Sequence, residues 1–138
     1  MQRSLRRWTE LAVAATAITG LGYGGLRYFG GGIDEWGDPQ MHPWTGFLQH
    51  SHILVVPAFV LVLGALWVVH IWPYYSSAKA NRRISGLANW GLALLMVVSG
   101  YAVQVSVSDD TRLAGVWVHG LSSTLWLGTF LWHRFIAH

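Results

Sequence analysis

Four long apolar stretches constrain this chain more than any other feature. They run over about residues 8–29, 47–72, 86–106 and 113–136. A helix that rises 1.5 Å per residue crosses the hydrocarbon core of a bilayer in about 20 residues, so each stretch is long enough to span it. Of all residues, 53% are hydrophobic and only 11% are charged, which is not the composition of a soluble domain. The sequence therefore predicts an all-α fold, a single integral membrane four-helix bundle over residues 1–138.

The first stretch has a second interpretation. The basic segment "MQRSLRRW" followed by "LAVAATAITG" also resembles the start of a secretory signal. Because the segment is retained in the chain, we expect a spanning helix here and not a cleaved signal.

Basic residues set the expected orientation, because the cytoplasmic loops of membrane proteins are enriched in Lys and Arg. Seven of the nine basic residues lie on one side of the predicted bundle: Arg3, Arg6, Arg7, Lys79, Arg82, Arg83 and Arg134. The opposite loops hold Arg27 and Arg112 together with Asp34, Glu35, Asp38, Asp109 and Asp110. We therefore expect an N-in/C-in arrangement with both termini in the cytoplasm. The net charge of +3 then reflects topology and gives no reason to propose a nucleic-acid partner.

Histidine is the strongest candidate for holding a cofactor. The chain has no cysteine, which excludes disulfides, thiolate-held iron–sulfur clusters and covalently attached c-type haem. Five of the seven histidines lie in or beside two of the apolar stretches: His50, His52 and His70 in the second, and His119 and His133 in the fourth. Ionisable side chains at membrane depth are costly and usually face the interior of a bundle. A single histidine at membrane depth is most often a hydrogen-bonded packing residue. Four histidines at matched positions are harder to explain in that way.

Helical periodicity pairs four of these histidines. At about 100° per residue, the 18-residue step from His52 to His70 returns to the same face, and the 14-residue step from His119 to His133 returns to within about 40°. The second and fourth stretches run in the same direction through the membrane, so His52 lies at the level of His119, and His70 at the level of His133. Two imidazoles facing each other across a helical bundle form the axial ligand set of a haem b. We therefore expect two haems b, a periplasmic-side haem between His52 and His119 and a cytoplasmic-side haem between His70 and His133.

The distance between the two ligands along the helix axis differs between the second and the fourth stretch. About 27 Å separates the ligands of the second stretch, and about 21 Å separates those of the fourth. Pro57 in the second stretch could absorb part of the difference by kinking the helix, and helix tilt could absorb more. His52 is the least secure of the four ligands, and His50, about 160° away around the helix, is its rival.

A faint repeat relates the first and third stretches. The segments "AITGLGYGG" (17–25) and "MVVSGYAVQ" (96–104) both place a small hydroxyl residue before a glycine and a tyrosine shortly after it. Small residues in membrane helices allow a neighbouring helix or a flat ligand to approach closely. We therefore expect packing surfaces at Gly20, Gly22, Gly24 and Gly100, with ordinary helix packing as the simpler interpretation.

The outer loop "GGGIDEWGDPQMHPW" (30–44) is glycine-rich, acidic and long for a helix connection. An interfacial cap anchored by Trp36 and Trp44 explains it, and a docking surface for a periplasmic partner is the alternative. The cap is favoured, because a few charges on an exposed loop are common.

Several polar or aromatic residues near the proposed ligands have two interpretations each. Five arginines could neutralise haem propionates, although topology and lipid headgroups explain them better: Arg27, Arg82, Arg83, Arg112 and Arg134. Four hydroxyls could orient ligand imidazoles, although helix packing is the default: Ser99, Ser122, Ser123 and Thr124. Three tryptophans are interpreted as space-filling or lipid-facing: Trp67, Trp126 and Trp132.

Three segments resemble the prokaryotic membrane di-haem cytochromes b, including the flavinylation-associated type and the cytochrome b subunits of membrane-bound formate dehydrogenases and hydrogenases. They are "HSHILVVPAFVLVLGALWVVHIW" (50–72), "VVSGYAV" (97–103) and "HGLSSTLWLGTFLWHRF" (119–135). The resemblance implies an inner-membrane protein of a bacterium that carries electrons between a quinone pool and a partner redox subunit. It supports His119 and His133 most strongly as ligands, then His70, then His52, because the second stretch departs from the family's spacing. It implies a quinone but places no quinone-binding residue.

These observations favour a b-type di-haem electron-transfer subunit over a catalytic subunit, and no residue is assigned a catalytic role. When protein ligands fill both axial positions, no coordination position stays open for oxygen chemistry. The alternatives are a stand-alone quinol-linked membrane reductase and a cofactor-free structural membrane subunit. Copper is a lesser alternative, because histidines about 20 Å apart on one helix cannot share one ion.

Overall fold

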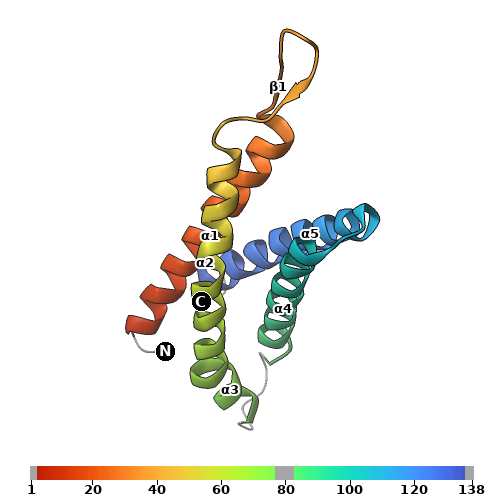
Figure 1. Ribbon diagram of the computed structural model, residues 1–138. Helices are drawn as coiled ribbons and strands as arrows, with labels where there is room; N and C mark the ends of the chain where they lie inside the picture. The colour runs from red at the N-terminus through yellow and green to blue at the C-terminus, as the bar shows by residue number, and fades with distance from the viewer. Residues whose placement is uncertain (1–2, 77–82, 136–138) are drawn as a thin grey trace. The chain divides into compact units, whose positions relative to one another are not determined.

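The computed structural model describes residues 3–76 and 83–135, which are mostly helical (Figure 1). The long helices are α1 (Arg3–Phe29), α2 (Thr45–Leu66), α4 (Arg83–Val105) and α5 (Asp109–Phe135). At its end α2 continues into a π-helical segment, η1 (Trp67–Ile71), and a short helix, α3 (Trp72–Ser76). The all-α expectation is thus confirmed, and each long helix follows one of the four apolar stretches.

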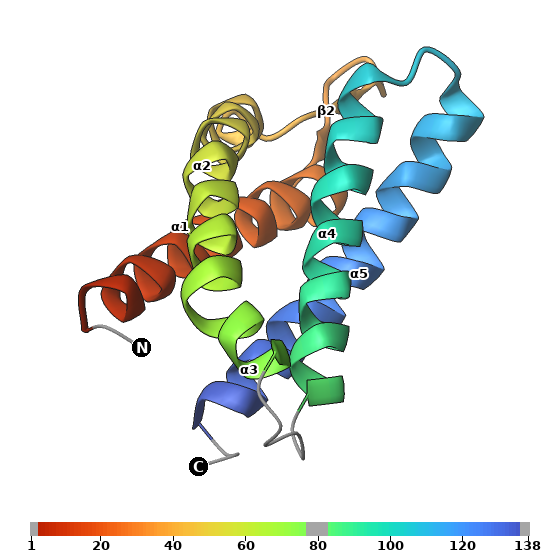
Figure 2. The ribbon, with the colours of Figure 1, turned by 90° about the horizontal axis from the view of Figure 1, so that it is seen from below.

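The chain divides into two compact units, residues 1–70 and 71–138. In the first unit α1 packs against α2, and in the second α4 packs against α5 (Figure 2). Each unit is therefore a helical hairpin in which the second helix carries the proposed histidine ligands.

Two helices are long and apolar enough to cross a membrane. They are α2 together with η1, over Thr45–Ile71, and the part of α4 over Gly86–Val105. Among the described residues, α1 and α5 do not reach the same mean hydropathy, because α1 begins with arginines and a glutamate, and α5 carries aspartates, histidines and hydroxyls. Length and composition alone therefore support two of the four predicted spans.

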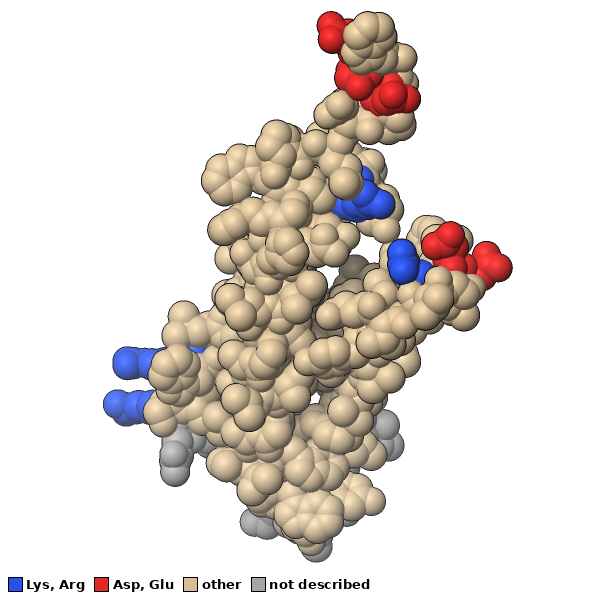
Figure 3. Space-filling model, viewed as in Figure 1, with Lys and Arg blue, Asp and Glu red and all other residues tan. Residues whose placement is uncertain are grey.

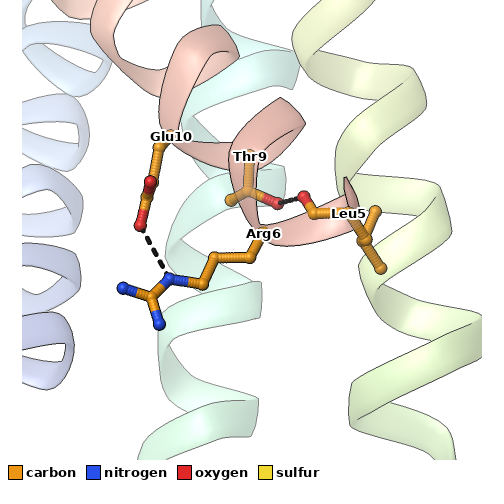
Figure 4. A network of polar contacts seen from close by, with 4 residues as sticks. All are labelled: Leu5, Arg6, Thr9 and Glu10. Atoms are coloured by element: carbon orange, nitrogen blue, oxygen red, sulfur yellow. Dashed lines mark hydrogen bonds and ion pairs between the residues drawn. The ribbon is translucent and has the colours of Figure 1, made fainter. Parts of the chain in front are cut away.

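The start of α1 balances part of its charge internally (Figure 4). Arg6 Nε donates to Glu10 Oε1 at 3.1 Å, and Glu10 is the acidic residue of the first apolar stretch. Thr9 Oγ1 donates to the carbonyl oxygen of Leu5 at 2.8 Å, so this hydroxyl is also satisfied within the helix. An exposed pair at this spacing contributes only about 0.3–0.5 kcal/mol to helix stability. Its main consequence is that Glu10 does not stand as an isolated charge in the stretch.

The connection between α4 and α5 is short, covering residues 106–108. The backbone N–H of Arg112 donates to the carbonyl oxygen of Ser108 at 3.0 Å, which closes the first turn of α5. Asp109 and Asp110 occupy that first turn, and Arg134 lies in the last turn. Negative charge at a helix N-terminus and positive charge at its C-terminus both favour the helix dipole. The sequence thus specifies both ends of α5.

The loop between α1 and α2 contains a β-hairpin that the sequence did not predict. Strand β1 (Gly32–Ile33) pairs antiparallel with β2 (Pro39–Gln40). The turn between them places Gly37 at a φ of +85°, a conformation that glycine adopts without strain. Trp36 at the turn is 82% exposed.

The Asp34 carboxylate ties this hairpin together. Its Oδ1 accepts from the backbone N–H groups of Asp38 and Trp36, both at 2.9 Å, and its Oδ2 accepts from Gln40 Nε2 at 3.1 Å. The Asp38 backbone N–H, followed by the Gln40 amide, holds the pKa of Asp34 below its ordinary value. Acidic side chains gather on this hairpin and at the start of α5 (Figure 3). The loop over residues 30–44 is therefore a folded acidic element.

Candidate functional site

His52 lies against α1 in the first hairpin. Its Nδ1 is 3.1 Å from Thr19 Oγ1. The single proton of the Thr19 hydroxyl points to the carbonyl oxygens of Ala15 at 2.7 Å and Thr16 at 3.2 Å. With that proton used in these bonds, Thr19 Oγ1 is left to accept from His52 Nδ1–H, and a neutral imidazole in this tautomer has its lone pair on Nε2.

Gly20 provides the space for this imidazole. A Cβ at Gly20 would lie 2.8 Å from His52 Cε1 and 3.2 Å from its Nδ1, inside the separation at which non-bonded carbon atoms attract. Any side chain at position 20 would displace the ring from Thr19. Thr19 thus provides the hydrogen-bond acceptor for the imidazole, and the adjacent Gly20 leaves the space that the ring occupies.

His119 lies against α4 in the second hairpin in a similar way. Its Nδ1 is 2.8 Å from the backbone carbonyl oxygen of Met96. A carbonyl oxygen only accepts, so the His119 Nδ1–H donates and Nε2 again carries the lone pair. A Cβ at Gly100 would lie 3.0 Å from His119 Cε1 and 3.1 Å from Nδ1. The neighbouring Ser99 Oγ donates to the carbonyl oxygens of Leu95 at 2.6 Å and Met96 at 3.0 Å.

The faint sequence repeat therefore corresponds to a repeat of contacts. Thr19–Gly20 and Ser99–Gly100 are 80 positions apart, whereas His52 and His119 are 67 apart, a difference of 13. The connection at 30–44 has 15 residues and that at 106–108 has three, which accounts for 12 of the 13. The two helical hairpins thus place a glycine of the first helix under a histidine of the second, and the β-hairpin is the main insertion.

The other predicted packing glycines differ in outcome. A Cβ at Gly22 would lie 3.1 Å from Leu48 Cδ1, so this residue also lies at the α1–α2 contact. At Gly24 a Cβ would meet nothing within 4 Å among the described residues. The prediction of a packing surface is therefore confirmed at Gly20, Gly22 and Gly100, and at Gly24 it stays a prediction.

The two proposed cytoplasmic-side ligands lie in different surroundings. His70 is half-buried in η1, and His133 is exposed in the last turn of α5. A π-helical turn contains one residue more than an α-helical turn, which shifts the phase of later residues by up to about 100°. The same-face relation of His52 and His70 assumed an unbroken α-helix, so it does not carry over unchanged. Helix α2 runs through Pro57 without a break, and the irregularity falls at η1 instead.

Within the described part of the chain, His50 and His42 have surroundings that differ from those of His52 and His119. His50 is exposed on α2, whereas its neighbour His52 is half-buried and hydrogen-bonded. His42 Nδ1 accepts from the backbone N–H of Trp44 at 3.2 Å in the outer loop. His138 lies outside the described residues.

Three of the five arginines contact groups near the ends of their helices. Arg27 donates to Met41 Sδ, Arg112 Nη2 donates to the Ser106 carbonyl oxygen at 2.9 Å, and Arg134 lies 5.2 Å over the Phe135 ring. Arg82 and the side chain of Arg83 lie outside the described residues. These local contacts test neither the interpretation as topology determinants nor the propionate role, and both stay predictions.

The hydroxyls singled out in the sequence bond mainly to their own helices. Those of Ser99, Ser122 and Thr124 donate to carbonyl oxygens three or four residues earlier. Ser123 Oγ is buried and has no hydrogen-bond partner among the described residues. Sequence reasoning missed Thr19, a hydroxyl that contacts the imidazole of a proposed ligand, although the Thr-Gly and Ser-Gly pairs of the repeat were its signal.

The three tryptophans singled out in the sequence lie in different surroundings. Trp126 is 7% exposed and stacks on Phe130, with ring centroids 5.2 Å apart, so it fills space. Trp132 is exposed on α5, and Trp67 begins η1. No electron-carrying role follows from these positions.

Within residues 3–76 and 83–135, no group of three or more His, Cys, Asp or Glu side chains is placed to hold a metal ion. A haem needs only one or two protein ligands, because the porphyrin supplies the rest. The chain matches no protein-family model, no curated protein and no solved structure. The resemblance to di-haem cytochromes b, drawn from segments 50–72, 97–103 and 119–135, therefore stays an expectation from the sequence.

Proposed function

We propose that this protein is a b-type di-haem electron-transfer subunit of the bacterial inner membrane. It passes electrons across the bilayer between a quinone pool and a partner redox protein. The observation that carries the proposal is the matched setting of His52 and His119. Each imidazole packs on a glycine and has Nδ1 within hydrogen-bond distance of the first helix of its own hairpin, and the neutral Nδ1–H tautomer that suits this contact has its lone pair on Nε2.

The chemistry of these two imidazoles fits a haem ligand. An iron ligand must be a neutral imidazole with a lone pair on one nitrogen, and ligating histidines usually donate their other ring N–H to a carbonyl, carboxylate or water. The His119–Met96 contact has this form, and the His52–Thr19 contact substitutes a hydroxyl for the carbonyl. A haem b, when bound, supplies a one-electron redox centre. The protein's part is to fix the ring orientation and the protonated nitrogen.

The proposed topology has four spanning helices with both termini in the cytoplasm. Helices α2 and α5 then run in the same direction, which puts His52 with His119 on the periplasmic side and His70 with His133 on the cytoplasmic side. The π-helical segment around His70 supports a functional role there, because π-bulges in helices occur frequently at functional sites. The quinone and the redox partner belong to the proposal without assigned residues.

A dithionite-reduced minus oxidised visible spectrum of the detergent-purified protein tests this function. We expect a b-type haem spectrum and reduction of at least one haem by a water-soluble quinol analogue. A protein that oxidises the quinol with ferric chelate as acceptor, and purifies without a partner, would instead be a stand-alone reductase. A folded, colourless protein would support the cofactor-free structural alternative.

A further inference from the structure

We propose that Thr19 is the positioning residue for His52 and tunes the reduction potential of the periplasmic-side haem through their hydrogen bond. The inference rests on the proposed function, because it supposes that His52 holds iron through Nε2. It extends that function to a residue on a different helix that need not touch the haem itself. The contact that carries it is the 3.1 Å separation of Thr19 Oγ1 and His52 Nδ1.

The Thr19 hydroxyl is fixed as an acceptor. Its proton is committed to the Ala15 carbonyl oxygen at 2.7 Å, so it cannot also donate to the imidazole. Turning the ring over about its Cβ–Cγ bond would replace Nδ1 by a carbon atom and lose the hydrogen bond. Thr19 therefore selects one tautomer and one ring orientation of His52, and Gly20 leaves room for only that close approach.

In the second hairpin, a backbone carbonyl oxygen and not a side-chain hydroxyl orients the histidine. His119 donates to the Met96 carbonyl oxygen, whereas the single proton of the Ser99 hydroxyl has its shorter contact with the Leu95 carbonyl oxygen, at 2.6 Å against 3.0 Å for Met96. Ser99 occupies the position equivalent to Thr19, yet its removal leaves the acceptor of His119 in place. The repeat thus contains an internal control: one hydroxyl that holds a histidine and an equivalent hydroxyl that does not.

Loss of the Thr19 acceptor should weaken the iron–imidazole bond. Mutation of groups that orient a metal ligand typically lowers metal affinity by about 10–100-fold. An imidazole whose Nδ1–H is hydrogen-bonded is a stronger electron donor, which favours the ferric state. Each tenfold loss of affinity specific to ferric haem raises the one-electron potential by about 59 mV.

The experiment is a spectroelectrochemical titration of the purified full-length protein and three variants. Thr19→Val removes the hydroxyl and keeps the β-branched shape, Thr19→Ser restores the hydroxyl, and Ser99→Ala removes its equivalent. We expect Thr19→Val alone to raise one of the two haem potentials or to lose that haem. A coloured Thr19→Val protein with unchanged potentials, or an equal shift in Ser99→Ala, would overturn the inference and leave the proposed function standing.

An unfolded Thr19→Val variant and a wild-type protein without haem have different consequences for the inference. If Thr19→Val does not fold, side-chain nitrogen NMR of the haem-free wild-type protein decides, because neutral His52 must be protonated on Nδ1; protonation on Nε2 overturns the inference. If the wild-type protein binds no haem, the proposed function fails and this inference fails with it.

Discussion

The His119 imidazole donates from Nδ1 to the Met96 backbone carbonyl oxygen at 2.8 Å, inside an unbroken stretch of α4. In an α-helix that carbonyl also accepts the backbone N–H of the residue four positions later, which is Gly100. A carbonyl oxygen has two lone pairs and can take both bonds. The imidazole reaches it because Gly100 has no side chain. Glycine at position 100 therefore lowers the helix propensity of α4 but allows the contact between the helix and His119.

Substitution at this glycine tests that exchange. Gly100→Ala places a Cβ 3.0 Å from His119 Cε1, and overpacking of this kind costs about 1–3 kcal/mol. Gly91→Ala on the same helix meets nothing within 4 Å and should gain up to about 1 kcal/mol from helix propensity. Thermal unfolding followed by circular dichroism measures both. Equal effects of the two substitutions would argue against a tight His119–Gly100 contact.

Substitution of the cytoplasmic-side ligands should separate the two haems. His70→Ala and His133→Ala each remove one axial ligand of the same proposed haem. We expect either variant to lose about half of the bound haem and to keep the periplasmic-side spectrum. His50→Ala is the matched control on α2 and should retain both haems. Loss of all haem from a folded single variant would contradict two independent levels.

Single cysteines test the four spans directly, because the wild-type chain has no cysteine to give background labelling. Ser4→Cys and Ser76→Cys should be protected from a membrane-impermeant maleimide in right-side-out vesicles. Trp36→Cys and Val107→Cys, at exposed positions, should react. Labelling of Ser4→Cys together with Trp36→Cys would show that α1 does not span.

The β-hairpin should depend on pH through Asp34. Its folded-state pKa lies below the ordinary value of 3.8, so the folded hairpin favours the deprotonated carboxylate. Stability from this group is therefore present at neutral pH and is lost as the pH falls below about 3.8 through the folded-state pKa. Backbone amide NMR of Trp36 and Asp38 should report this change. The transition should be absent in Asp34→Asn; if it persists there, another group is responsible.

Runs of apolar residues are a strong signal, so the four apolar stretches predicted the four long helices, although the fourth was expected to begin at residue 113 and α5 begins at Asp109. Sequence reasoning missed the β-hairpin, which depends on cross-strand bonds to one carboxylate at Asp34. It placed the irregularity of the second stretch at Pro57, whereas the helix changes at η1, just before Pro73. Pro73 has no backbone N–H, and its ring crowds the carbonyl four residues earlier, at Val69. Sequence reasoning noted Gly20 and Gly100 but could not connect them to His52 and His119. That connection depends on the register between two helices, which no local pattern reports.

The most direct test of the central claim is the number of haems per polypeptide. A pyridine haemochrome assay on the purified protein, combined with amino-acid analysis, gives this ratio. The account predicts about two haems b per chain, one for each histidine pair, and about one in the His52→Ala variant. A folded wild-type protein with no haem, or a His52→Ala variant that still holds both, would contradict it.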